Sequence, residues 1–176
     1  MDIAIRYFTK SKKGNTEKLA NVVSKALDIK ALDVSNDLEE NVDKLLLINA
    51  MYAADIDKEV KEFLSRNKDK IGEIINMNTS ASGASTWKNV KKVADNLQIK
   101  LSEKEFHCAA SWIFINKGLP TLDDYKQAEE FVLSLWLRHK KDKNTDNARK
   151  IKTFGHLILV RFDEIKIIVE RLSVNG

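Results

Sequence analysis

Short apolar runs alternate with amphipathic stretches of helical spacing from the first residues of the chain to about residue 136. Continuous apolar runs are typical of strands covered on both faces, and amphipathic stretches between them are typical of crossover helices. This alternation, five times over, predicts an α/β fold with a parallel sheet and helices on both faces. We expect strands at residues 3–8, 29–34, 45–48, 73–77 and, as one interrupted strand, 106–108 with 112–115. We expect helices that begin near Asn15, Asp57, Ser85 and Thr121.

The last 40 residues differ in character from the rest. They carry ten Lys and Arg against five Asp and Glu, whereas residues 1–136 carry 20 against 21. Residues 138–152 are nearly devoid of apolar side chains and fit a solvated linker or a frayed helix. An apolar run at 156–162 and a helical stripe at 162–172 follow. We therefore divide the chain into a domain at 1–136 and a basic linker with an apolar appendage at 137–176, which either packs on the domain or supports a homodimer.

Bulk composition narrows the class of protein. Hydrophobic residues make up 43% and charged residues 32% of the chain, which is typical of a globular domain. The high isoelectric point belongs to the last segment, so it does not indicate a nucleic-acid partner. Apolar runs are too short for a membrane span, the first residues do not look like a secretory signal, and the one cysteine, Cys108, cannot form an internal disulfide. We expect a cytoplasmic protein with no membrane partner.

The loop between the first strand and the first helix, residues 9–16, is rich in hydrogen-bond donors. Ser11 and Thr16 supply hydroxyl groups, Gly14 lets the backbone present its amides, and the following helix adds the positive end of its dipole. These features suit a phosphate monoester, although a solvated lysine-rich turn with an ordinary helix cap explains them equally well. Neither G-x-x-x-x-G-K-[ST] nor G-x-G-x-x-G is present, so the common nucleotide-binding motifs are excluded.

Four segments, taken in order, resemble the flavodoxin family. S-x-x-G-x-T at residues 11–16 resembles its phosphate loop, and residues 47–60 resemble its third strand with the flavin loop. Residues 78–83 look like its fourth-strand loop, and residues 103–108 with 117–120 look like its fifth strand and the entry to its last helix. The resemblance covers residues 1–136. It implies a flavodoxin-like three-layer sandwich with a five-stranded parallel sheet of order 2-1-3-4-5.

The resemblance also implies a cofactor, flavin mononucleotide (FMN), and three groups of residues that hold it. The phosphate would lie among Ser11, Lys12, Lys13, Gly14, Asn15 and Thr16. The ring would pack on Tyr52, together with Met51 and Ala53, while its edge and the ribityl chain would face Thr79, Ser80, Ala81 and Gly83. The implied function is electron transfer, as a redox carrier or a small flavin reductase that works with a redox partner protein or a nicotinamide donor. The alternative is a flavodoxin-like interaction module without a cofactor.

Three departures from the family pattern are visible. Lysines 10, 12 and 13 stand in a phosphate loop that usually lacks countercharge, and Ala53-Ala54 replaces a glycine-containing turn. The fourth-strand loop lacks the tyrosine that stacks on flavin in bacterial electron-transfer members.

Two rival sites fit the residues less well. A receiver-type phosphoacceptor set could be drawn from Asp55, Thr79 and Lys117, but the acidic pair after the first strand is missing. His107 and Cys108 are neighbours on a strand, so their side chains point to opposite faces and cannot form a catalytic dyad.

Overall fold

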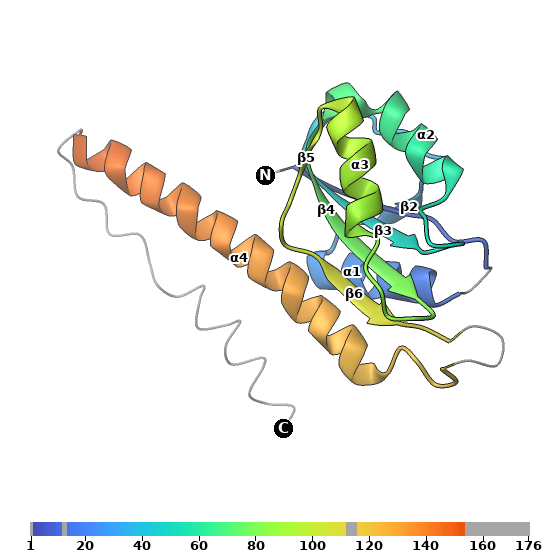
Figure 1. Cartoon of the computed structure of the whole chain (residues 1–176). Coiled ribbons are helices and arrows are strands. Elements are labelled where there is room, and N and C mark those ends of the chain that lie inside the picture. The colour runs from blue at the N-terminus through green and yellow to red at the C-terminus, as the bar shows by residue number, and fades with distance from the viewer. Residues whose placement is uncertain (1, 12–13, 112–115, 154–176) are drawn as a thin grey trace. The chain divides into compact units, whose positions relative to one another are not determined.

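A parallel sheet forms the centre of the first 137 residues (Figure 1). The computed structural model describes residues 2–11, 14–111 and 116–153, and describes side chains as far as residue 137. The strands are β1 (Ile3–Tyr7), β2 (Ala31–Asp33), β3 (Val42–Ala50), β4 (Ile71–Ser80), β5 (Lys100–Leu101) and β6 (Phe106–Ala109). Their order is β2-β1-β3-β4-β5, and β6 also pairs with β4. Every pairing is parallel, so the predicted strand order is confirmed.

The fifth position of the sheet is shared by two short strands. Lys100 and Leu101 of β5 pair with the first half of β4, and β6 pairs with its second half, from Met77 to Ser80. This position is therefore interrupted at residues 102–105, before β6, where the sequence predicts no break. At the break, Glu105 Oε2 accepts hydrogen bonds from Asn76 Nδ2 at 3.2 Å and from the Ser85 hydroxyl. The other predicted piece, 112–115, lies outside the described residues.

The helices lie on both faces of the sheet. They are α1 (Asn15–Leu27), α2 (Lys58–Arg66), α3 (Trp87–Leu97) and α4 (Leu122–Thr153). In β3, Leu45 and Leu47 pack with residues of α2 and α3, whereas Leu46 and Ile48 pack with α1 and the first part of α4. Complete burial of each such side chain contributes about 1.5–3 kcal/mol. The alternation along β3 thus produces the predicted three layers.

Two helix starts carry the caps that the sequence predicts. Asp57 Oδ1 accepts a hydrogen bond from the backbone N–H of Glu59 at 3.2 Å. Before α4, the Thr121 N–H donates to Asp124 Oδ2 at 2.7 Å, and the Asp124 N–H donates to Thr121 Oγ1 at 3.2 Å. Such caps each contribute about 1 kcal/mol. The starts of α2 and α4 are therefore encoded locally.

The chain divides into two units, residues 1–137 and 138–176. Helix α4 continues to Thr153. It includes the basic residues 138–152, for which the sequence predicts either a solvated linker or a frayed helix. The apolar run at 156–162 and the stripe at 162–172 lie outside the described residues.

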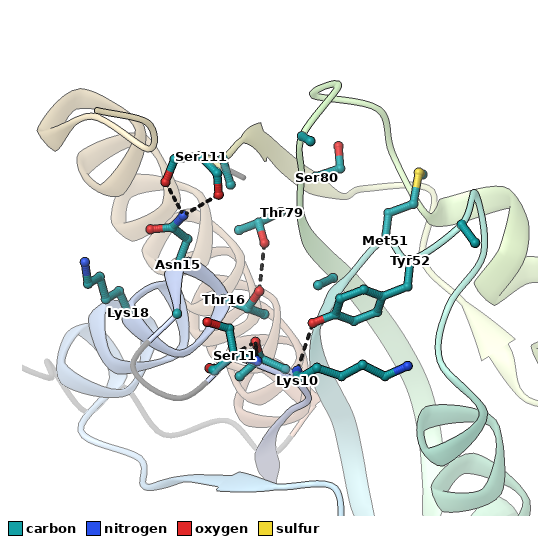
Figure 2. Close-up of a pocket in the computed structure, with 16 residues that line it drawn as sticks. Lys10, Ser11, Asn15, Thr16, Lys18, Met51, Tyr52, Thr79, Ser80 and Ser111 are labelled. Atoms are coloured by element: carbon teal, nitrogen blue, oxygen red, sulfur yellow. Dashed lines mark hydrogen bonds between the residues drawn. The ribbon is translucent and has the colours of Figure 1, made fainter. Parts of the chain in front are cut away.

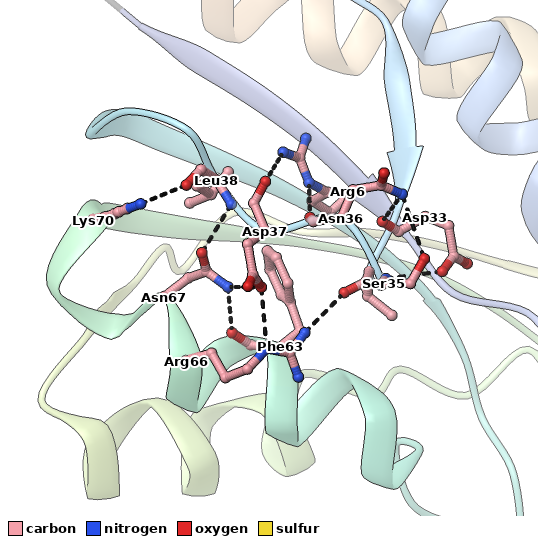
Figure 3. A network of polar contacts seen from close by, with 11 residues as sticks. Arg6, Asp33, Ser35, Asn36, Asp37, Leu38, Phe63, Arg66, Asn67 and Lys70 are labelled. Carbon is pink, nitrogen blue, oxygen red and sulfur yellow. Dashed lines mark hydrogen bonds and ion pairs between the residues drawn. The ribbon is translucent and has the colours of Figure 1, made fainter.

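The connection from β2 to β3 contains no helix among its described residues, and the sequence predicts no helix start there. Side chains hold this loop instead (Figure 3). Arg6, buried in β1, donates from Nε to the carbonyl of Asn36 at 2.9 Å and from a terminal nitrogen to that of Asp37 at 3.0 Å. Asn67, at the end of α2, accepts from the Leu38 N–H at 2.8 Å and donates to Asp37 Oδ1 at 2.9 Å. Buried polar side chains thus hold this connection in place.

Candidate functional site

A cavity of about 900 Å³ lies where several of the parallel strands end (Figure 2). Ligands of open α/β sheets bind at this edge, because the loops after neighbouring strands diverge there. The segments around the cavity are those that follow β1, β3, β4 and β6. Its lining consists of Thr9, Lys10, Ser11, Gly14, Asn15, Thr16, Lys18, Ala50, Met51, Tyr52, Ala53, Thr79, Ser80, Ala81, Ala110 and Ser111.

The loop after β1 turns tightly into α1. The Gly14 N–H donates to the carbonyl of Ser11 at 3.2 Å, and the Ser11 N–H donates to Thr9 Oγ1 at 3.2 Å. A Cβ atom on Gly14 would lie 2.9 Å from Ser11 Cβ and 3.0 Å from its carbonyl oxygen, so only glycine fits without a shift of the loop. Gly14 is also the N-cap of α1, and as a glycine it supplies no side-chain cap hydrogen bond. The positive end of the helix dipole therefore faces a cavity lined by hydroxyl groups.

Two side chains from the first turn of α1 connect this loop to other parts of the cavity. Thr16 Oγ1 lies 2.7 Å from Thr79 Oγ1 at the end of β4, and both residues are buried. Asn15 Nδ2 donates to the hydroxyl of Ser111 at 3.0 Å and to its carbonyl at 3.3 Å. Thr16 is thus fixed to β4, and Asn15 is fixed to the segment after β6.

Tyr52 is held in place by three neighbours. Its hydroxyl accepts a hydrogen bond from the backbone N–H of Lys10 at 2.8 Å, and its ring packs edge-on against Phe8 at 6.5 Å. Lys10 Nζ lies 4.9 Å from the centre of the ring and 2.6 Å from a carboxylate oxygen of Asp57. The hydrogen bond to Asp57 raises the pKa of Lys10, so the amine stays charged. Lys10 and Tyr52 therefore hold each other in place beside the cavity.

The residues that follow Tyr52 form a two-residue turn. The Tyr52 N–H donates to the Asp55 carbonyl and the Asp55 N–H to the Tyr52 carbonyl, each at 2.9 Å. Ala53 and Ala54 both have positive φ, 47° and 62°, which is the requirement of a type I′ turn and is usually met by Asn or Gly. This left-handed conformation costs an alanine roughly 1–2 kcal/mol relative to the right-handed one. The turn next to the cavity is therefore strained.

Side chains of α2 and α3 hold this strained turn. Asn89 Nδ2 donates to the Ala54 carbonyl at 3.1 Å, and Lys61 Nζ contacts Asp55 Oδ2 at 2.5 Å. The hydrogen bond from Lys61 holds the pKa of Asp55 below its usual value, against the effect of burial. Asp55 is thus an anchor of the turn, which does not favour the phosphoacceptor alternative.

The segment after β4 forms the opposite wall. The Ser80 hydroxyl donates to the Ala84 carbonyl at 2.9 Å, and the Ser80 carbonyl accepts from the Ala110 N–H at 2.9 Å. Gly83, with φ of 72°, accepts a hydrogen bond at its carbonyl from His107 Nδ1 at 2.9 Å. Gly83 is not among the lining residues, although Ala81 in the same loop is.

The structure brings most of the predicted site residues to one cavity. Those that line it are Ser11, Gly14, Asn15, Thr16, Met51, Tyr52, Ala53, Thr79, Ser80 and Ala81. Lys12 and Lys13 lie outside the described residues, and the cofactor contacts of the whole set stay predictions. Six further residues line the cavity and were not predicted as site residues from the sequence: Thr9, Lys10, Lys18, Ala50, Ala110 and Ser111. Ala110 and Ser111 could have been found, because they directly follow a predicted strand.

Metal-ligating clusters and free thiols are two further kinds of group that can supply chemistry to a site. Across the described residues there is no cluster of three or more His, Cys, Asp or Glu suited to a metal ion. Burial raises the pKa of Cys108 to about 11, so this thiol is protonated at neutral pH. The described part of the cavity wall contains Lys10 and Lys18 and no carboxylate. No helix in the described ranges is long and apolar enough to cross a membrane.

Comparison with known proteins shows a matching sequence family and solved structures of similar fold. The family model described as the flavodoxin domain matches residues 7–146. Similar solved structures include a flavodoxin from the domain Archaea, with a TM-score of 0.60 and 9% identity over 80% of this chain and 99% of that one. A flavodoxin from Streptococcus pneumoniae TIGR4 has a TM-score of 0.55 and 15% identity, over 77% and 99% of the two chains. Flavodoxin 2 from Bacillus cereus has a TM-score of 0.56 and 12% identity, over 78% and 99%. Curated proteins give no match.

Proposed function

Because this chain belongs to the flavodoxin domain family, we propose that its cavity binds FMN and that the protein transfers electrons. One observation carries the proposal. A loop rich in donors at a helix N-terminus and an immobilised tyrosine line the same cavity of about 900 Å³. The first suits a phosphate and the second suits a flat aromatic ring, and FMN contains both.

The phosphate end of FMN fits the loop after β1. A phosphate monoester accepts several hydrogen bonds and carries nearly two negative charges at neutral pH. Ser11 and Thr16 supply hydroxyl groups, the start of α1 supplies a positive dipole end, and Lys18 lies one turn further along the lining. Because Gly14 has no side chain, the backbone of the loop is uncovered at this position. These residues would hold and orient the phosphate.

The ring end fits the wall formed by Met51 and Tyr52. Flat aromatic rings pack favourably on one another and on methionine sulfur. When bound, FMN supplies reversible one- and two-electron chemistry at its ring. The chain's own residues would orient that ring, exclude water from one face and set the local charge. The charge of Lys10 near Tyr52 is balanced by Asp57, so it is the absence of carboxylates from the described lining that favours a ring that gains negative charge.

The remaining assignments follow from this proposal. The electron donor or acceptor is a redox partner protein or a nicotinamide, and the protein acts as a carrier or a small flavin reductase. The proposed compartment is the cytoplasm, consistent with a single buried cysteine. Residues 137–176 are a packing appendage or a dimer contact.

The test is the visible spectrum of purified protein mixed with FMN and passed through gel filtration. Flavin absorbance that elutes with the protein supports the proposal, as does its loss and return on reduction and reoxidation. A colourless protein fraction contradicts it and leaves the flavodoxin-like interaction module without a cofactor.

A further inference from the structure

Thr16 and Thr79 form a buried pair of hydroxyl groups that joins two walls of the cavity (Figure 2). Their oxygens are 2.7 Å apart, and each residue is about 3% exposed. Both belong to the cavity lining, Thr16 in the first turn of α1 and Thr79 near the end of β4. We propose that Thr79 is a positioning residue, which directs the Thr16 hydroxyl as a donor toward a phosphate monoester and so sets the preference for FMN over riboflavin. This inference rests on the proposed function.

The partner of Thr16 cannot easily move away. Strand β4 lies inside the sheet, where Thr79 pairs with Ala50 on one side and with Cys108 on the other. The Thr79 carbonyl also accepts a hydrogen bond from the Met51 N–H at 3.2 Å. The Thr79 hydroxyl is therefore presented from a rigid backbone, and Thr16 is the more adjustable member of the pair.

The number of protons in the pair gives it two arrangements. A hydroxyl group has one proton to donate and two lone pairs to accept with. When Thr79 donates to Thr16, the Thr16 proton is free to point into the cavity. When Thr16 donates to Thr79, Thr16 presents only lone pairs to the cavity, which repel an anion. A phosphate therefore selects the first arrangement, and the bond from Thr79 strengthens the donor that the phosphate uses.

The two flavins respond differently to these arrangements. Phosphate oxygens are mainly acceptors, so FMN needs Thr16 as a donor. Riboflavin has a hydroxyl at that place, which donates or accepts as required. The ribityl chain of both flavins is expected to face Thr79, but the Thr79 hydroxyl itself is used in the bond to Thr16. Loss of this hydroxyl should therefore weaken FMN clearly more than riboflavin.

The experiment measures dissociation constants of FMN and riboflavin by flavin fluorescence for the unaltered chain, Thr79→Val and Thr79→Ser. We expect Thr79→Val to weaken FMN about fivefold, since a hydrogen bond to a charged group is weakened rather than removed. Riboflavin should change less than about twofold, which also shows that the variant is folded. Thr79→Ser keeps the hydroxyl and should restore FMN binding. Thr86→Val is the matched control, because this buried threonine bonds Asn76 and does not line the cavity.

A double variant tests whether Thr79 acts through Thr16. In a Thr16→Ala background, Thr79→Val should cause no further loss of FMN affinity, because the group it positions is gone. Equal losses for FMN and riboflavin, failure of Thr79→Ser to restore FMN, or additive losses in the double variant would each overturn the inference. If the unaltered chain binds neither flavin, the proposed function fails and the inference with it.

Discussion

Two polar clusters on loops of this protein use their hydrogen-bonding groups in opposite ways. In the cluster around Asn67, donors and acceptors meet one another (Figure 3). The Asn67 carboxamide donates to Asp37 Oδ1 and to the Phe63 carbonyl, each at 2.9 Å, and its oxygen accepts from Leu38. The Arg6 guanidinium donates hydrogen bonds to backbone carbonyls, those of Ile5, Asn36 and Asp37. At the cavity, hydroxyl groups, a helix N-terminus and two lysines surround open space (Figure 2).

The difference separates a cluster that holds the fold from a cluster that, on the proposed function, binds FMN. Buried polar groups must be satisfied, by the protein itself, by water or by a ligand. The Asn67 cluster is satisfied by the protein and holds the connection between β2 and β3. The cavity leaves part of its capacity for a ligand, so substitutions there should change affinity more than stability.

The largest expected effect is at Gly14. In Gly14→Val the new side chain collides with Ser11 and must displace the loop that faces the phosphate. Losing about two hydrogen bonds to a charged group, at about 1.5 kcal/mol each, lowers FMN affinity on the order of 100-fold. Titrations with both flavins check this, and riboflavin should lose much less. Equal losses would place the phosphate elsewhere.

The next effect is at Asn67. Asn67→Ala leaves the buried Leu38 N–H without its partner, so the free energy of unfolding should fall by about 2 kcal/mol. Denaturant titration measures it, and Asn36→Ala, an exposed amide in the same loop, should change stability by less than about 0.5 kcal/mol. FMN affinity of the folded Asn67→Ala variant should be unchanged. A clear loss of affinity would break the distinction between the two clusters.

The smallest effect concerns the strained turn beside Tyr52. Glycine adopts the positive φ of residue 54 without strain, so Ala54→Gly should raise the free energy of unfolding by about 0.5 kcal/mol after its greater unfolded-state entropy is counted. Ser35→Gly, in the β2–β3 loop, lacks a positive φ to relieve and should be destabilising. If Ala54→Gly also lowers stability, the turn is not strained.

Periodicity and turn chemistry predicted most of the fold. The caps at Asp57 and Thr121 appeared as expected because they depend on local spacing, and the strand order appeared as the resemblance to the flavodoxin family implied. The buried Arg6 was not predictable, since an arginine in a strand indicates an exposed position unless the carbonyls that it reaches are known. The break before β6 also escaped prediction, because the Glu105 contacts that fill it join residues about 20–30 positions apart.

For the candidate site, the sequence predicted part of the cavity lining, and the contacts of these residues with a cofactor stay predictions. Motif resemblance located Gly14, Thr16 and Tyr52, whereas the pairing of Thr16 with Thr79 and of Asn15 with Ser111 depends on the folded chain. Lys10 was visible as a charge in the loop. Its place beside the Tyr52 ring follows only from the arrangement of β1 next to β3.

The most direct test of the binding cluster is an experimental structure of the protein crystallised with FMN. The account predicts the phosphate within hydrogen-bond distance of Thr16 Oγ1 at the start of α1, and the ring packed beside Tyr52. A flavin bound in the reverse direction, bound outside this cavity, or absent at saturating FMN would contradict it.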